Sequence, residues 1–467
     1  MKAPLPALFF LVLAACAGPR PETPPAATVT PPQSWRTALG AEAGEVDALW
    51  WKSFGDPALA HIVDEALAGN DDIELAATRV VEARGQFHLA KAQALPNIVG
   101  AATAARDRDV NPGFGVPEQQ IAGVAALFVS YDVDLFGRLA NASQAAHATL
   151  LSSEAAHDNV RLAITASVVS GYINLRALDG RLVVLRDTLT ERAASLEVAR
   201  RRASAGYASQ LDLAQAEADY RTAAQLIPAA ELAITRQEDG LSVLLGTNPH
   251  AIERGLDLND LVLPTAPVMM PAAMLRRRPD IVAAEDQLVA ADRALDSARA
   301  AFMPDIQLSA LGGFIGTSLI PSTNTNPVSI FSLGGSILAP IFDSGRLQAQ
   351  QETAAARRDQ AAFAYRKAAI TAFREVEDAL AGVRRLAEQE AALVAQRDVL
   401  ARTLGLATNR YRAGYSPYLD QLDAERGLLS VELTLVQSRA DRLDAAVSLY
   451  QALGGGWQTA EEKAIHD

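Results

Sequence analysis

Cysteine is almost absent from the chain. Of 467 residues only Cys16 carries a thiol, so no disulfide can form within one copy of an exported chain. The six histidines are scattered, and no pair has the spacing of a metal site. The sequence also lacks HExxH, GxSxG and phosphate-binding GxxxxGK patterns. We therefore predict no metal site, no cofactor and no catalytic residues, and we do not expect an enzyme.

The apolar run at the N-terminus is too short to span a membrane as a helix. Lys2 supplies a basic start, Leu8 to Leu13 form a short apolar core, and small residues precede Cys16. This pattern predicts a signal peptide at residues 1–15, and LAA directly before Cys16 matches the bacterial lipobox. We expect cleavage before Cys16 and lipid on its thiol; an uncleaved anchor with a free thiol is the alternative. Ala17 in place of aspartate favours the outer membrane, by similarity to sorted lipoproteins.

An excess of positive charge is missing too. The formal net charge is −13, which argues against nucleic acid as a partner and leaves a cation or a neutral solute possible. Residues 16–49 form a proline-rich segment, which we expect to run extended and mobile from Pro19 to Pro32. The folded part is predicted to start near Trp50.

The chain repeats itself at an offset of 208 residues. Four pairs of markers share this offset, which predicts two copies of one large unit and disfavours two unrelated domains. We place repeat 1 at residues 50–249, repeat 2 at residues 250–457 and a tail at residues 458–467. The paired markers are Leu95-Pro96 and Met303-Pro304, Arg138 and Arg346, Gly206-Tyr207 and Gly414-Tyr415, and Leu245-Gly246 and Leu453-Gly454.

Each repeat contains a stretch with the alternation of strands. From Ile121 to Leu135 apolar residues occupy mostly odd positions, whereas Ser130 and Asp132 occupy even ones. Residues 306–310 and 331–341 of repeat 2 alternate in the same way. Such alternation predicts strands with one apolar and one polar face.

Turn-forming sequences separate these strands, at residues 111–117 and 321–327, so each repeat offers one hairpin. We place the hairpins at about residues 97–136 and 305–342. Two hairpins make four strands, but a transmembrane barrel needs at least about eight. If the strands span a membrane, the barrel must be shared between subunits; an ordinary sandwich hairpin covered by helices is the alternative.

Long helices are predicted where proline is absent. Arg138 to Gly206 contains none, and a continuous helix of these 69 residues would reach about 100 Å at roughly 1.5 Å per residue. Arg192 falls on an apolar stripe with coiled-coil spacing, so we expect that seam to be partly solvated. The stripes comprise Leu182, Leu185, Leu189 and Leu196, and again Phe373, Val376, Leu380 and Val383.

Proline and acidic residues mark other helix boundaries. The return run from Gln210 to Leu245 contains Pro228, whereas repeat 2 has Val436 at the equivalent position. We therefore expect the two repeats to differ in a kink there. Arg276–Asp280 places a proline and an acid in a first helical turn, and Asp71-Asp72 is its counterpart.

Six ordered motifs carry a resemblance to a known family. The chain from about Cys16 to Trp457 is similar to the TolC-like outer-membrane factors, and most similar to their NodT and OprM-type lipoprotein branch. The motifs are WWKSFGDPAL (50–59), FGR (136–138), RRRPDI (276–281), PIFDSGR (340–346), RYRAG (410–414) and LGGGW (453–457).

This resemblance implies a mainly α-helical fold with a transmembrane β-barrel. Family members are homotrimers whose protomers each give four strands to a twelve-stranded barrel, continuous with a long periplasmic α-helical barrel. The implied function is the outer-membrane channel of a tripartite efflux pump, associated with multidrug resistance and conducting drugs, metals or other small solutes. The implied partners are outer-membrane lipid, a periplasmic adaptor (membrane fusion) protein and an inner-membrane transporter, often of the resistance-nodulation-division type.

Two glycine turns are candidate tips. Gly206 and Gly414 stand where long helices must turn back, and glycine permits the positive φ of a helix C-terminus. Ser209 is a candidate cap of the returning helix. The resemblance implies that the tips contact the adaptor through Ala205-Gly206-Tyr207 and Ala413-Gly414-Tyr415. Many family tips carry valine before the glycine, so this pair differs from the usual pattern.

A pair of acids follows the second tip. Asp420 and Asp423 are three residues apart and therefore lie on one helical face. By resemblance they match the acidic ring of the periplasmic constriction, where three protomers would bring six carboxylates together, and Leu419 matches an apolar residue at the same end. A solvated helix face is the alternative.

The family's closing network is matched in part. Tyr411 corresponds to one of its members, but Ser416 stands where the family has an arginine, which leaves the closing contacts open. Repeat 1 offers Asp212 and Gln215 at the positions equivalent to Asp420 and Asp423.

Two other functions stay open at this stage. The same fold serves protein secretion through an ABC-type exporter in some relatives, although the lipobox and LGGGW favour efflux. A lipid-tethered periplasmic coiled-coil scaffold would keep the hairpins out of any membrane. The tunnel wall of the family is nonspecific, so the solute is not predicted.

Overall fold

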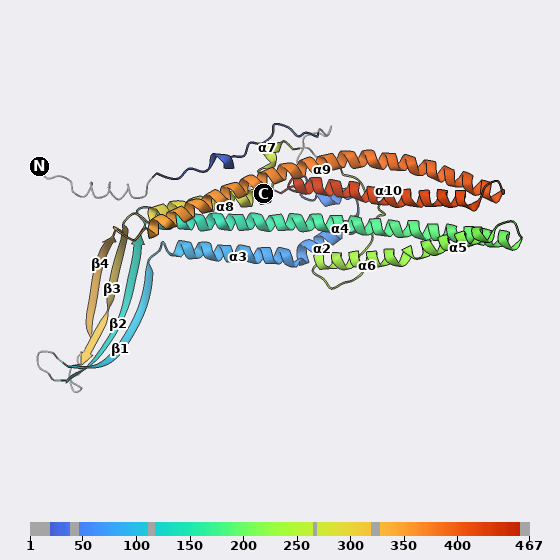
Figure 1. Ribbon diagram of the computed structural model, residues 1–467. Helices are drawn as coiled ribbons and strands as arrows, with labels where there is room; N and C mark the ends of the chain where they lie inside the picture. The colour runs from blue at the N-terminus through green and yellow to red at the C-terminus, as the bar shows by residue number, and fades with distance from the viewer. Residues whose placement is uncertain (1–18, 38–45, 111–116, 265–268, 319–326, 458–467) are drawn as a thin grey trace. The chain divides into compact units, whose positions relative to one another are not determined.

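The computed structural model describes residues 19–37, 46–110, 117–264, 269–318 and 327–457 (Figure 1). Its helices are α2 (Pro57–Gly69), α3 (Asp71–Ala92), α4 (Arg138–Ser204), α5 (Gln210–Ala224), α6 (Leu226–Leu244), α7 (Pro271–Met274), α8 (Pro279–Ala300), α9 (Arg346–Arg412) and α10 (Tyr418–Ala452). Its strands are β1 (Asn97–Val110), β2 (Pro117–Val133), β3 (Asp305–Ser318) and β4 (Val328–Leu338), and short 3-10 helices cover Pro25–Ala27 and Trp50–Phe54.

The chain divides into two compact units. Unit 1 comprises the described residues within Met1–Thr28, Arg79–Glu154 and Ala283–Arg366. Unit 2 comprises those within Val29–Thr78, Ala155–Val282 and Lys367–Asp467. Both repeats contribute to both units.

Unit 1 contains a four-stranded antiparallel sheet in the order β1-β2-β3-β4. β1 pairs with β2 and β3 with β4, so both predicted hairpins are confirmed, and β2 joins them by pairing with β3. The strands end earlier than the alternation predicts. β2 stops at Val133 before Leu135, and β4 stops at Leu338, beyond which Pro304 and Pro340 have no N–H to donate. The predicted turn sequences lie almost entirely outside the described residues.

Long outgoing helices and shorter returns make up most of the fold. α4 and α9 each contain 67 residues, as the absence of proline predicts for α4. The return of repeat 1 is interrupted at Gln225, three residues before Pro228, whereas α10 continues through Val436. The predicted difference between the repeats is confirmed, because a proline ring clashes with the carbonyl one turn earlier. None of the helices in the described ranges is both long and apolar enough to cross a membrane.

Both repeats close the return helix onto the start of another helix in unit 2. Asn70 Nδ2 donates to the Leu244 carbonyl at 2.8 Å, and its Oδ1 accepts from the backbone N–H groups at the start of α3. The equivalent residues of repeat 2, 208 positions later, make the same contact: Arg278 Nη1 donates to the Ala452 carbonyl at 3.0 Å. Gly454 has φ of +91°, and a Cβ there would collide with the Arg277 carbonyl oxygen. The same joint is therefore built twice with different side chains.

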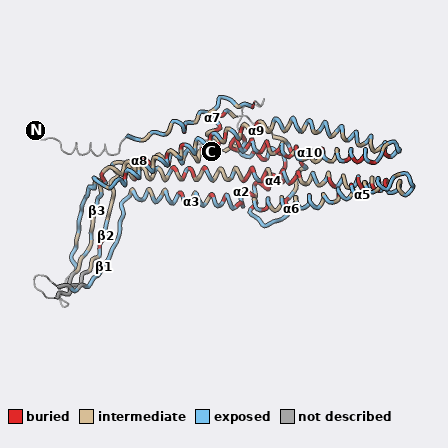
Figure 2. The backbone as a smooth tube through the Cα atoms, in the orientation of Figure 1, coloured by how far each residue is buried: buried red, intermediate tan, exposed pale blue. Residues whose placement is uncertain are grey.

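The core of unit 2 explains two motifs of the sequence. Trp50 is 1% exposed, and its ring stacks on Tyr450 with centroids 5.2 Å apart. Trp457 of LGGGW donates from Nε1 to Asp158 Oδ2 at 2.6 Å. Asp56 caps α2 and accepts from the Tyr172 hydroxyl at 2.7 Å. Figure 2 shows buried residues along α2, α4 and α10 and mostly exposed or half-buried strands.

The described part of the N-terminal segment contacts the folded body, while its mobility stays a prediction. In unit 1, Arg20 Nη2 contacts Asp292 Oδ2 at 2.7 Å, and its Nε contacts Asp296 Oδ1 at 2.9 Å. Arg358, only 1% exposed, donates to the carbonyls of Pro21 and Glu22. These ion pairs and carbonyl contacts hold an otherwise extended, proline-rich chain against α8 and α9.

Candidate functional site

The sheet of unit 1 has one apolar face. The register aligns Ile98, Val129, Ala310 and Leu333 in one row across the four strands, and alternate rows repeat the pattern. Phe331 and Leu333 are 89% and 85% exposed in the single chain. The apolar residues of this face include Ile98, Leu127, Val129, Tyr131, Ile306, Leu308, Ala310, Phe331, Leu333 and Ile337. A contiguous apolar surface of this kind marks contact with lipid or protein.

The opposite face of the sheet is partly polar. Gln307 Nε2 donates to Asp132 Oδ1 at 3.3 Å between β3 and β2. Ser130, Ser309 and Ser336 lie on the same side. β1 and β4 each pair with a single strand among the described residues, so the sheet has two open edges. The first face is apolar, whereas the opposite face mixes polar side chains with apolar ones such as Phe128 and Leu311.

The two tips in unit 2 have the predicted glycine turns. Gly206 and Gly414 have φ of +74° and +81°. Ser209 caps α5: its Oγ accepts from the Asp212 N–H at 3.1 Å, and the Asp212 carboxylate accepts from the Ser209 N–H. The predicted cap is therefore confirmed. Ala205 and Ala413, the residues before the glycines, are exposed. Tyr207 and Tyr415, which follow them, are 79% and 80% exposed.

Arg202 joins the two tips, although no feature of the sequence singled it out. Its Nη1 donates to the Tyr411 carbonyl at 2.5 Å, and its guanidinium carbon lies 4.7 Å from the centre of the Tyr411 ring. A cavity of about 300 Å³ lies beside it, lined also by Asp212 and Ser416. Ser416 stands where the resemblance implies an arginine, and at this cavity a guanidinium comes from the other tip. Basic residues at a helix C-terminus are common for electrostatic reasons, so Arg200–Arg202 gave no specific signal.

Tyr411 belongs to a buried cluster between the helices that lead to and from the two tips. It is 4% exposed, and its ring centre lies 5.4 Å from that of Tyr418. Burial raises the pKa of Tyr411, the Arg202 charge opposes this shift, and the Asp212 charge adds to it. The other members of the cluster are Leu196, Ala199, Ala216 and Leu422. The cluster fixes α10 against α4 and α5 near the tips.

The acidic pair lies on the opposite side of α10. Asp420 and Asp423 are exposed, and Leu419 is 48% exposed. The buried side of the same turns carries Gln421 and Glu425. Their placement agrees with the spacing of the sequence, and their role in a constriction stays a prediction.

Arg192 corrects another expectation. The seam was predicted to be solvated there, but the Arg192 side chain is 4% exposed and its Nη1 lies 3.0 Å from Asp219 Oδ1. The partner comes from α5, 27 residues away, and Asp219 is itself 2% exposed. Charge pairing with Asp219, in place of water, accommodates this arginine.

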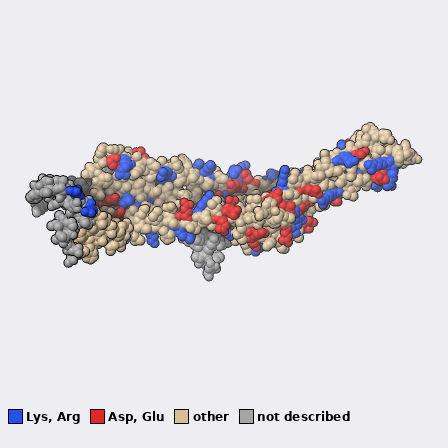
Figure 3. All heavy atoms as spheres, turned by 90° about the horizontal axis from the view of Figure 1, so that it is seen from below, with Lys and Arg blue, Asp and Glu red and all other residues tan. Residues whose placement is uncertain are grey.

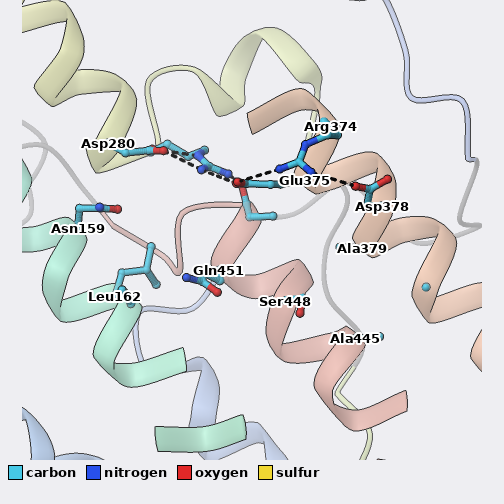
Figure 4. Close-up of a pocket in the computed structure, with 14 residues that line it drawn as sticks. Asn159, Leu162, Asp280, Arg374, Glu375, Asp378, Ala379, Ala445, Ser448 and Gln451 are labelled. Atoms are coloured by element: carbon cyan, nitrogen blue, oxygen red, sulfur yellow. Dashed lines mark hydrogen bonds and ion pairs between the residues drawn. The ribbon is translucent and has the colours of Figure 1, made fainter. Parts of the chain in front are cut away.

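A second, larger cavity of unit 2 carries paired charges. It has a volume of about 620 Å³ and lies among α4, α8, α9 and α10 (Figure 4). Arg278 contacts Asp280 and Glu375 at 2.8 and 2.7 Å, and Arg374 contacts Glu375 and Asp378. Both arginines are thus engaged by carboxylates of the same wall. Figure 3 shows basic and acidic side chains interspersed along the visible helical surface as well. Within the described ranges, no group of His, Cys, Asp and Glu has the arrangement of a metal site.

Comparison with protein families decides the identity. The model of the "Outer membrane efflux protein" family matches residues 62–247 and again residues 270–455. The second match starts and ends 208 residues after the first, which confirms the internal repeat. The chain belongs to the outer membrane efflux protein family. It is thus an outer-membrane efflux component, and the resemblance to TolC-like channels is confirmed.

Individual relatives and structures agree with this family. The toluene efflux pump outer membrane protein TtgC of Pseudomonas putida is 33% identical over 451 residues, covering 94% of this chain and 91% of that protein. The outer membrane protein OprJ of Pseudomonas aeruginosa is 33% identical over 475 residues, covering 98% and 97%. The solved outer-membrane channel OprN superposes with a TM-score of 0.85 at 27% identity, covering 92% of this chain and 99% of that one.

Proposed function

We propose that three copies of this efflux protein join through β1 and β4 into one twelve-stranded barrel in the outer membrane. The observation that carries the proposal is the four-stranded sheet with two open edges and one apolar face. Open edges are not tolerated in lipid, and four strands are too few to close a barrel. Pairing β4 of one copy with β1 of the next satisfies both conditions.

The helices α4, α5, α6, α9 and α10 then form a periplasmic tunnel that conducts small solutes outward. The relative in Pseudomonas putida is named for toluene efflux, so apolar aromatic compounds are the first solutes to test. We propose that the tips at Gly206 and Gly414 meet a periplasmic adaptor and that an inner-membrane transporter supplies the solute. The exposed Tyr207 and Tyr415 give that contact two large side chains.

We also propose that Cys16 carries the lipid anchor. Cys16 lies outside the described residues, but Arg20, four positions later, is held by Asp292 and Asp296. These ion pairs would fix the point at which a lipid anchor leaves the folded protein. Mass spectrometry of the mature N-terminus tests it: a diacylated or triacylated Cys16 is expected, and an unprocessed Met1 would contradict the proposal.

The channel itself performs no chemistry in this proposal. Both arginines of the cavity in Figure 4 are paired with neighbouring acids. The relatives above bear the names of an efflux pump component and an outer membrane protein. They do not favour protein secretion as the function.

Single-channel conductance of the purified lipoprotein tests the proposal. Wild type is compared with the double variant Asp420→Ala plus Asp423→Ala in a planar bilayer. We expect a small conductance that multivalent cations block in wild type, and a larger, unblocked conductance in the variant, because six carboxylates would be removed from the narrowest point. Absence of channels from heat-modifiable trimers would reject the conduit and favour a tethered scaffold.

A further inference from the structure

The buried side of α10 near the tips is polar. Glu425 is 8% exposed, and its Oε1 accepts from Gln421 Nε2 at 2.7 Å and from the Ser195 hydroxyl of α4 at 3.2 Å. Gln421 Nε2 also lies 3.1 Å from Ser195 Oγ. Glu425 Oε2 finds no hydrogen-bond partner within the described part of the chain. A carboxyl group is thus held between two helices by uncharged donors.

Asp219 completes the arrangement from α5. Arg192 of α4 contacts its Oδ1 at 3.0 Å and donates to its backbone carbonyl at 3.1 Å. Arg426 of α10 approaches the same oxygen at 3.6 Å, with a side chain that is 59% exposed. One set of buried polar contacts therefore joins α4, α5 and α10. These contacts lie further from the tips than the cluster of Tyr411 and Tyr418.

These contacts determine the rotation of α10 about its axis. Gln421 and Glu425 are four residues apart and share the buried face, whereas Asp420 and Asp423 lie on the exposed one. A rotation by one residue, about 100°, would bring Asp420 to the place of Gln421. Burying such a carboxylate without a partner is costly, so the polar contacts select one rotation.

We propose that Arg192, Asp219 and Glu425 are positioning residues, which hold α10 so that Asp420 and Asp423 face the channel, with the charge on Glu425 setting how firmly α10 is held. This inference rests on the proposed constriction. It assigns a role to side chains that touch neither the solute path nor the tips, and it makes the constriction sensitive to protons.

The proton dependence follows from what surrounds Glu425. Ser195 and Arg192 on α4, Asp219 on α5, and Gln421 and Tyr418 on its own helix surround it. Arg426 approaches Asp219, and α9 contributes Tyr411 to the adjoining cluster. Burial is the largest cause that raises the pKa of Glu425, and the Asp219 charge adds to it, while Gln421, Ser195 and Arg192 oppose it.

The sign follows from that raised pKa. Stability of the α10 contact is fully present below the pKa that Glu425 has in an unfolded chain, and it is lost as pH rises through the folded pKa. Ionised Glu425 then stands buried beside Asp219, and α10 loosens. We expect cation block to weaken as the pH rises through the raised pKa of Glu425.

The test measures block by hexamminecobalt(III) as a function of pH for wild type, Glu425→Gln, Glu425→Ala and Asp441→Asn. Asp441 is an exposed acid further along α10 and serves as the control. Glu425→Gln keeps an oxygen that accepts from Gln421, so it should retain the block and lose its pH dependence. Glu425→Ala should weaken the block about tenfold at every pH, a change of about 1.4 kcal/mol. Asp441→Asn should follow wild type.

The outcomes separate this inference from the proposed constriction. If wild type is not blocked, or if Asp420→Ala plus Asp423→Ala does not abolish the block, the constriction itself is wrong. If wild type behaves as expected but Glu425→Gln keeps its pH profile, the positioning role is rejected. Should Glu425→Ala fail to give heat-modifiable trimers, the isosteric Glu425→Gln decides alone.

Discussion

The two tips are built at equivalent positions but with different chemistry. Asp212 of repeat 1 is occupied in the capping box with Ser209. Its counterpart, Asp420, follows Pro417, which offers neither a hydroxyl nor an N–H, so α10 starts without a side-chain cap. The carboxylate of Asp420 stays exposed as a result. One copy uses its acid to stabilise a helix, and the other leaves the equivalent acid exposed and outside any cap.

The buried contacts diverge in the same way. Asp219, the ion-pair partner of Arg192, corresponds to Gly427 of α10, where an added Cβ would lie 3.3 Å from Leu400. The joint at the other end of the return helix is instead retained, with Asn70 replaced by Arg278. The two repeats therefore retain the contact at the end of each return helix and differ in the contacts near the tips.

The largest effect is expected where the two repeats are most alike. Gly454→Ala should destabilise the protein by about 4 kcal/mol or more, because the residue has φ of +91° and its new Cβ would collide with the Arg277 carbonyl. Gly246→Ala should do nearly the same against Gly69. Thermal melting of the detergent-solubilised trimer measures both losses.

Gly405→Ala is the matched control for these variants. It lies within α9, has open space around its Cβ position, and should be neutral or gain up to about 1 kcal/mol. Equal melting of Gly454→Ala and Gly405→Ala would show that the closing joint contributes nothing to stability.

A smaller effect is expected where the return helices differ. Val436→Pro should cost about 3 kcal/mol, because it removes a backbone hydrogen bond from the continuous α10. Pro228→Ala should change stability by less than about 1 kcal/mol, since α5 and α6 are already separated at Gln225. The melting temperatures of the two variants check this order. Comparable losses of stability in both variants would mean that Pro228 itself stabilises the interruption between α5 and α6.

Much of the fold follows from patterns along the chain. Proline-free runs, glycine turns and period-two alternation each depend on near neighbours, so they located α4, both tips and both hairpins. The strand ends were less certain because β2 and β4 stop where backbone pairing stops, while the apolar pattern continues to Leu135 and Ile341. Alternation reports side chains, and the ladder depends on partners.

The buried contacts could not be found in this way. Arg192 on an apolar stripe suggests solvent unless the partner is known, and Asp219 stands on another helix with no feature that distinguishes it from a surface acid. Arg202 was missed because its target, the Tyr411 carbonyl, belongs to the other tip. The docking of Arg20 on Asp292 likewise joins positions 272 residues apart. Such contacts depend on tertiary packing, which a single sequence does not reveal.

The smallest effect tests the difference between the tips directly. Pro417→Ser gives repeat 2 the hydroxyl and the N–H that Ser209 supplies in repeat 1. We expect the new cap to raise the free energy of unfolding by about 0.5–1 kcal/mol. We also expect a cation block about two- to threefold weaker, which corresponds to a loss of a few tenths of a kcal/mol in cation binding. The reason is that Asp420 would turn toward its own backbone. Ser209→Ala is the companion variant: it should lose about 1 kcal/mol and leave the block unchanged. Conductance and melting of the same trimers measure both quantities. A Pro417→Ser protein that melts higher while its block stays at the wild-type level would show that capping and cation binding do not compete for Asp420.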